Sequence, residues 1–175
     1  MYKVGKTLVS EEEIQKMLTD ISNRINNDYA GCDEIIMVGV LRGALVFLSD
    51  LMRRIKIPVI MDFMVVSSYG VDTETSGVVL LIKDIDTELE GKHVIIVEDL
   101  IDTGVTLKYL KNLLESRKPA SLKICAAFDK PARRIADIEA DYVGLTLPDE
   151  FVIGYGLDFA NMYRNLPDVR ILEEV

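Results

Sequence analysis

Cysteine and histidine, which form disulfides and the common zinc sites, are scarce in this sequence. Among its 175 residues there are two cysteines, Cys32 and Cys125, and one histidine, His93. Neither cysteine stands in the spacing of a structural metal site. Cys125 lies in the apolar run 122–128 and is expected to be a small buried hydrophobe. Because reduced thiols are typical of the cytosol, the sequence favours a cytoplasmic protein.

Long apolar runs and an excess of positive charge are also missing. No apolar run approaches the roughly 18 residues of a membrane span, and residues 1–6 lack the apolar core of a signal peptide. The 20 basic and 29 acidic residues give a net charge of −9, which opposes non-specific binding to nucleic acid. We therefore expect neither a membrane nor a nucleic acid as a partner. A small anionic substrate stays possible where a few Lys and Arg side chains converge.

The residues that are present predict a single domain, 1–175, of the α/β class. At this length, and with 49% hydrophobic residues, a chain can bury roughly 70% of its unfolded surface. Branched aliphatic runs alternate with stretches of helical periodicity, which predicts a mostly parallel sheet flanked by helices. The expected strands are 34–41, 59–66, 78–82, 94–97 and 121–128, and the expected helices are 11–27, 44–52 and one that begins after Gly104. The polar stretch 70–77 predicts a mobile loop, and the tail 141–175 predicts a small hood of short strands beside the sheet.

Two adjacent carboxylates, Glu98 and Asp99, follow the predicted central strand 94–97. They repel one another at neutral pH unless a divalent cation or a ribose diol shares them. The other interpretation is a solvated acidic loop, which is the commoner fate of such pairs. His93 precedes the strand and lies away from the acidic turn, so we assign it no catalytic role.

The turn that follows, residues 102–106, opens a helix. The first N–H groups of a helix have no partner within it, and together with the hydroxyls of Thr103 and Thr106 they suit a phosphate. Asp102 places a third carboxylate inside this turn. Its simpler role would be to serve the start of the helix.

Several charged residues lie just past predicted strand ends. They are Arg42, Glu98, Asp99, Asp102 and Lys130. Ligands of parallel sheets bind outside the carboxyl ends of the strands, so these side chains could meet at one rim. Taken alone, Arg42 could cap a carboxylate and Lys130 could be a solvated surface lysine.

The string 94–106 resembles the phosphoribosyl-diphosphate binding motif of the phosphoribosyltransferases. It consists of four branched aliphatics, Glu-Asp, two aliphatics and Asp-Thr-Gly-x-Thr. The resemblance implies a type I phosphoribosyltransferase fold in which Glu98 and Asp99 meet the ribose hydroxyls and magnesium. It also implies that the 5′-phosphate is bound by the residues Asp102, Thr103, Gly104, Val105 and Thr106.

Further segments, in the expected order, are similar to the hypoxanthine-guanine branch of this family. The resemblance implies that the Leu41-Arg42-Gly43 turn binds diphosphate, often through a cis peptide, and that Arg164 faces the same group. Ser68 and Tyr69 match the family's mobile lid, which excludes water. Without the resemblance, Arg164 would be a surface ion pair.

The purine end of the site is implied by two other segments. Lys130 matches a lysine that donates to the exocyclic oxygen of the purine. Phe151 matches the aromatic residue that stacks on the base, with the backbone of Val152 reading the purine edge and Asp158 serving the magnesium side. Taken alone, Phe151 would be assigned to the core, because an aromatic beside branched aliphatics usually lies there.

The activity implied by the resemblance is purine salvage. The enzyme would transfer 5-phosphoribosyl from phosphoribosyl diphosphate to hypoxanthine or guanine, giving IMP or GMP and diphosphate. Magnesium would be its cofactor, Asp102 would take the proton from purine N7, and a homodimer or homotetramer is expected.

Three alternatives stay open. One is a phosphoribosyltransferase for xanthine or another base. A second is a regulator that binds nucleic acid, which should show a basic face or an added segment. The third is a silent binding module, whose expected signature would be the loss of Asp102 or Lys130; both are present.

Overall fold

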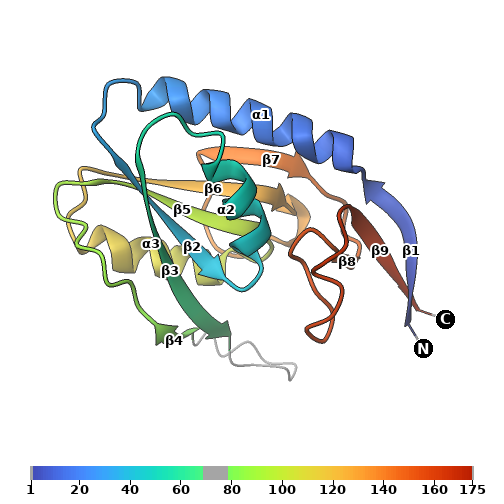
Figure 1. The fold of residues 1–175 in the computed structure, drawn as a ribbon. Coiled ribbons are helices and arrows are strands. Elements are labelled where there is room, and N and C mark those ends of the chain that lie inside the picture. The colour runs from blue at the N-terminus through green and yellow to red at the C-terminus, as the bar shows by residue number, and fades with distance from the viewer. Residues whose placement is uncertain (1, 69–78, 175) are drawn as a thin grey trace.

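The computed structural model describes residues 2–68 and 79–174 (Figure 1). Its helices are α1 (Glu11–Asp28), α2 (Ala44–Met52) and α3 (Val105–Glu115), with a 3₁₀ turn at Pro131–Arg133. Its strands are β1 (Tyr2–Val9), β2 (Ile35–Leu41), β3 (Val59–Ser68), β4 (Val79–Lys83), β5 (His93–Ile101), β6 (Ser121–Asp129), β7 (Tyr142–Thr146), β8 (Val152–Ile153) and β9 (Val169–Glu174). Tyr69 and the predicted mobile loop 70–77 lie outside the described residues.

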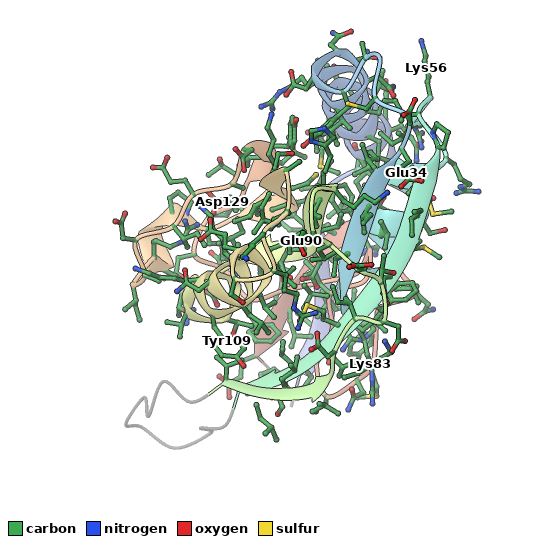
Figure 2. All side chains as sticks on the ribbon, turned by 90° about the vertical axis from the view of Figure 1, so that its left-hand side faces the viewer. Glu34, Lys56, Lys83, Glu90, Tyr109 and Asp129 are labelled. Atoms are coloured by element: carbon green, nitrogen blue, oxygen red, sulfur yellow. The ribbon has the colours of Figure 1, made fainter. Side chains whose placement is uncertain are left out.

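Six strands form the larger sheet, in the order β4-β3-β2-β5-β6-β7. The pairs β2 with β3, β2 with β5, β5 with β6 and β6 with β7 are parallel, whereas β4 runs antiparallel to β3. β4, which ends at Lys83, lies at the outer edge (Figure 2). The predicted α/β class with a mostly parallel sheet is confirmed.

Helices cover both faces of the larger sheet (Figure 1). Along β5, Ile95 and Val97 enter the core that contains α1 and α2, while Val94 and Ile96 enter the core that contains α3. Successive side chains of a strand point to opposite faces, so a strand between two helical layers must be apolar at every position. This requirement explains the unbroken aliphatic run in the sequence.

The first helix begins as its sequence predicts. The hydroxyl of Ser10 accepts the Glu13 N–H at 3.3 Å, and the Glu13 carboxylate accepts the Ser10 N–H at 2.8 Å, which completes a capping box. The apolar stripe of α1 then packs against the sheet. Within residues 2–68 and 79–174, none of the helices has the length and apolar character of a membrane span.

The central strand is longer than expected. β5 does not end at Val97 but continues to Ile101, because its backbone stays paired with β6, where Glu98 lies opposite Ala126. On its other side, the pairing of β5 with β2 stops at Val97. Glu98 and Asp99 therefore lie within the strand, and the prediction that they directly follow its end was wrong. The end of β5 has one strand neighbour and one open side.

The predicted hood, 141–175, is built differently in the structure. Its first strand, β7, is parallel to β6 and belongs to the larger sheet. The separate small sheet has the order β1-β9-β8. Besides β8 and β9 it therefore contains β1, from the N-terminal end of the chain (Figure 1). β1 was missed because most of its residues are exposed and only long-range pairing with β9 makes it a strand. Hereafter "hood" means β1, β8, β9 and the turns 154–168.

Candidate active site

A pocket of about 230 Å³ lies where β5 extends beyond β2. Its lining comes from the end of β2, from Val66 and from residues 98–107. The predicted site residues that share this lining are Gly43, Glu98, Asp99, Asp102, Thr103, Gly104 and Thr106. This is the carboxyl edge of the parallel sheet, the place where ligands of such sheets bind.

The turn 102–106 leads directly into α3. Gly104 is the N-cap residue with φ of +79°, a left-handed conformation that glycine adopts without strain, and Val105 is the first helical residue. Gly104 has no side chain to cap this end of α3, and the Val105 N–H makes only a long hydrogen bond of 3.5 Å to the Thr103 hydroxyl. The N–H groups of the first turn of α3 have no partner within the helix and suit an anion, and the binding of a phosphate here stays a prediction.

The segment after β6 supports this turn from behind. The N–H groups of Ile135 and Ala136 donate to the Thr103 carbonyl at 2.9 and 3.0 Å. Arg134 donates to the carbonyl of Asp102 at 3.1 Å and also pairs with Asp129. Sequence reasoning missed Arg134, although its position four residues past Lys130 was a weak signal. The turn is thereby fixed before any ligand arrives.

The acidic pair is partly buried and poorly compensated. Within the described residues, Glu98 Oε2 is a buried oxygen without a hydrogen-bond partner. Burial, followed by the charge of Asp99, raises the pKa of Glu98 well above its usual value. Burial also raises the pKa of Asp99 to about 6, opposed by the Leu100 N–H at 2.8 Å and by the charge of Arg164. Two such carboxylates suit a guest that brings positive charge or hydroxyl donors.

This electrostatic cost predicts that Asp99→Asn stabilises the free protein. Between the usual pKa of 3.8 and about 6, the folded protein keeps a proton on Asp99 that the unfolded chain has released. The contribution of Asp99 to stability is thus largest below this window and falls as the pH rises through it. At pH 8 the variant should gain about 1–2 kcal/mol in urea unfolding, and it should lose this part of the pH slope.

Asp62 offers a matched control of opposite sign. Its carboxylate accepts hydrogen bonds from Asp86 N, Thr87 N and the Thr87 hydroxyl, which hold the pKa of Asp62 below its usual value despite its burial. Asp62→Asn should therefore destabilise the protein at pH 8. A loss of stability in Asp99→Asn as well would contradict the account of the acidic pair.

The turn after β2 packs directly against Asp99. The peptide bond between Leu41 and Arg42 is cis. A Cβ atom on Gly43 would lie 1.7 Å from Asp99 Oδ2, and a Cβ on Gly156 would lie 2.3 Å from the Gly43 carbonyl oxygen. The backbone of Gly43 is therefore enclosed between the acidic pair and the hood.

Arg42 and Arg164 both contact residues 156–161. An Arg42 guanidinium nitrogen donates to Asn161 Oδ1 at 3.0 Å. Arg164 pairs with Asp158 at 2.6 Å and donates to the Gly156 carbonyl at 2.7 Å. The ion pair that the sequence suggested for Arg164 is present, and it joins two predicted site residues.

The three predicted metal ligands do not form one cluster. Among the described residues, no group of three or more His, Cys, Asp or Glu side chains is arranged to hold a metal ion. Glu98, Asp99 and Asp158 therefore do not form such a group. Asp158 is engaged by Arg164 and by the Asn161 N–H. Magnesium is usually held through one or two carboxylates together with substrate oxygens, and the unpartnered oxygen of Glu98 fits such a role.

Lys130 and Phe151 are not where their simpler interpretations put them. Lys130 is only 5% exposed, and its ammonium donates to the Glu150 carbonyl at 2.5 Å. Burial lowers the pKa of Lys130, and the charge of Asp102 opposes this shift. Phe151 is 53% exposed, whereas the next residue, Val152, is buried. Lys130 is thus a buried hydrogen-bond donor, and the side chain of Phe151 is half exposed.

Asp102 lies beside a second unpredicted arginine. Arg133 Nε is 2.8 Å from Asp102 Oδ1 in an ion pair, although the two groups are not aligned as a hydrogen bond. The same guanidinium is 3.3 Å from Asp149. Within the described residues, Asp102 Oδ1 is therefore buried against the Arg133 guanidinium without an aligned hydrogen bond.

Residues 5–160 match the family model of the phosphoribosyl transferase domain. The chain belongs to this family. It is 48% identical over 172 residues to the hypoxanthine-guanine phosphoribosyltransferase of Bacillus subtilis, covering 98% of this chain and 95% of the relative. A bifunctional TilS/HprT protein of Listeria monocytogenes is 47% identical over 170 residues, which are 97% of this chain and 26% of that longer protein. A crystal structure of a hypoxanthine-guanine phosphoribosyltransferase from Bacillus anthracis has a TM-score of 0.92 at 45% identity and covers 99% of this chain and 100% of that one.

The family predicted from the motifs is thus confirmed. In this phosphoribosyl transferase domain, the lid predicted at Ser68 and Tyr69 is not part of the described pocket. Ser68 ends β3, where its backbone pairs with Val79, and Tyr69 is outside the described residues. His93 begins β5, at the opposite end from the acidic pair, and its ring contacts the Ser121 hydroxyl at 2.8 Å.

Proposed function

We propose that the protein transfers the 5-phosphoribosyl group from phosphoribosyl diphosphate to hypoxanthine or guanine. The products are IMP or GMP and diphosphate, so the enzyme acts in purine salvage. The observation that carries this proposal is the buried ammonium of Lys130, which donates to the carbonyl of Glu150, the residue that precedes the half-exposed Phe151. Together they offer a hydrogen-bond donor and a stacking surface to a base.

In this proposal the phosphoribosyl group lies along β5 and the turn 102–106. Backbone N–H groups at the start of α3, with Thr103 and Thr106, bind the 5′-phosphate. Glu98 and Asp99 accept hydrogen bonds from the ribose hydroxyls. Their raised pKa values support this role, because a diol supplies the donors that the carboxylates lack.

Breaking the bond at the anomeric carbon places positive charge on the sugar and negative charge on the leaving diphosphate. The cis turn at Arg42 and Gly43, together with Arg164, binds and stabilises the leaving group. Glu98 and Asp99, with Asp158 nearby, are the residues that would hold magnesium. When bound, magnesium supplies charge neutralisation to the diphosphate.

Asp102 is the proposed general base. It takes the proton from purine N7 while N9 attacks the anomeric carbon and diphosphate leaves, and the place of Asp102 in the pocket lining supports this assignment. Lys130 donates to the exocyclic oxygen next to N7. A cationic donor at this place excludes adenine, which carries an amino group there, more strongly than it excludes xanthine.

The test is nucleotide formation from phosphoribosyl diphosphate and magnesium, with hypoxanthine, guanine, xanthine and adenine supplied separately. We expect turnover of the first two, none with adenine, and loss of activity when a chelator removes magnesium. Turnover restricted to xanthine would favour the alternative substrate. Binding of phosphoribosyl diphosphate without turnover of any base would contradict the proposal and favour a sensor.

Two further expectations belong to this proposal. Cys32 and Cys125 are both free thiols, in keeping with a cytoplasmic location. A homodimer or homotetramer is expected from the family resemblance, and light scattering of the purified protein will decide between these states and a monomer.

A further inference from the structure

Three aromatic side chains from distant parts of the chain meet on the hood. They are Tyr2 of β1, Phe159 of the turn after β8, and Phe151, the proposed stacking surface. The ring centroids of Tyr2 and Phe159 are 4.7 Å apart, and those of Phe159 and Phe151 are 5.7 Å apart. Phe159 is therefore the middle ring of a row that ends at the purine site.

We propose that Phe159, supported by Tyr2, is a positioning residue that sets the orientation of the Phe151 ring for the purine. This inference rests on the proposed function, since it assigns Phe151 the role of stacking on the base. The inference adds Phe159 and Tyr2 to the residues that determine purine binding, although neither has to contact the purine.

The geometry of the Phe151 ring supports this role. Its plane is perpendicular to that of Phe159, a T-shaped arrangement that aromatic pairs favour. Such a pair occupies at most one face of the Phe151 ring, and the residue remains half exposed. Because Phe151 is 53% exposed, few other contacts restrict its rotation, and the edge contact with Phe159 becomes decisive.

The backbone fixes both ends of this contact. The Phe151 carbonyl accepts the Leu172 N–H of β9 at 2.8 Å, so the residue is tied to the small sheet. Phe159 is held by two backbone hydrogen bonds with Met162, at 3.2 and 2.9 Å. Two anchored residues thus present their rings to one another, and the remaining freedom lies in the side chains.

Tyr2 extends the same row outward. It lies in β1, opposite Glu174 of β9, and is itself 49% exposed. Its ring is tilted by 55° against that of Phe159. A bound purine would cover the Phe151 end of this exposed aromatic row. Exposed apolar patches on soluble proteins commonly mark such binding sites.

Most residues proposed to bind phosphoribosyl diphosphate lie on β5, on α3 and after β2. Asp158 and Arg164 lie in the same turns as Phe159, but they are held by their own ion pair at 2.6 Å and not by the Phe159 ring. Loss of the Phe159 ring should therefore affect the purine selectively. We expect Phe159→Leu to raise KM for hypoxanthine about three- to tenfold, in line with the usual strength of an aromatic pair. KM for phosphoribosyl diphosphate and kcat should change less than about twofold.

Three further variants define the mechanism. Phe159→Tyr keeps the ring and should restore the KM of the unaltered enzyme. Tyr2→Leu, at an exposed position where unfolding is not expected, should raise KM for hypoxanthine by a smaller factor. In a Phe151→Leu background, Phe159→Leu should have little further effect, because residues that act through one another are not additive.

The outcomes separate this inference from the proposed function. If Phe151→Leu raises KM for hypoxanthine but Phe159→Leu does not, the inference fails and the proposed function stands. An equal fall in affinity for both substrates, or full additivity with Phe151→Leu, shows a general structural role and also overturns it. If the unaltered protein forms no nucleotide at all, the proposed function fails and this inference with it.

Discussion

Asp102→Asn is expected to lower kcat for nucleotide formation about 10²- to 10⁴-fold, the range that general base catalysis contributes. Asparagine has the shape of aspartate but cannot take the proton from purine N7. The turn itself should survive, because Arg134 holds it through the Asp102 backbone carbonyl at 3.1 Å, which the substitution keeps. Steady-state kinetics with hypoxanthine and phosphoribosyl diphosphate measure the change, and both KM values should stay within a few-fold.

Asp149→Asn is the matched control for this substitution. Asp149 shares Arg133 with Asp102, at 3.3 Å, but it is not part of the pocket lining. Its replacement removes the same charge from the same arginine, and kcat should stay within a few-fold of the unaltered value. Full turnover by Asp102→Asn, or an equal loss in both variants, would remove the assignment of Asp102 as the base.

Gly43→Ala is expected to reduce kcat/KM for phosphoribosyl diphosphate about 10²-fold. The added methyl group would lie 1.7 Å from Asp99 Oδ2, so either the Asp99 carboxylate or the turn must move. Misplacement of a positioning group by about 1 Å can cost a factor of this size. KM for hypoxanthine should change much less, because Lys130 and Phe151 lie outside this contact.

Gly31→Ala controls for the general effect of replacing a glycine. Gly31 has φ of +90° and no atom within 4 Å of an added Cβ, so the substitution strains the backbone without a steric clash. It should lower the melting temperature slightly and leave kcat/KM unchanged. If Gly43→Ala behaves in the same way, the close contact with Asp99 has no functional weight.

The predictions from sequence were most accurate where the signal is local. The start of the first helix at residue 11 and the turn 102–106 were predicted from consecutive residues, and the structure has both. Boundaries were less accurate. β5 extends to Ile101 because pairing with β6 continues past the aliphatic run, and a pattern of side chains does not reveal how far a neighbour extends.

Burial was the other quantity that the sequence left open. A lysine after a strand is usually solvated, yet Lys130 is buried against the Glu150 carbonyl. An aromatic beside aliphatics is usually core, yet Phe151 is half exposed. In both cases the residue type alone favoured the opposite environment, and the tertiary packing decided the observed one.

The sequence by itself determined the α/β class, the adjacent carboxylates Glu98 and Asp99 and the turn 102–106, because each depends on neighbouring residues whose geometry is local. The tertiary structure decided how these parts work together. Gly43 is enclosed between Asp99 and Gly156, which are far from it in the chain. In the same way, Phe159 contacts both Tyr2 and Phe151 and so links distant segments. Such contacts are fixed by the packing of strands and turns against one another, and no single stretch of sequence contains that information.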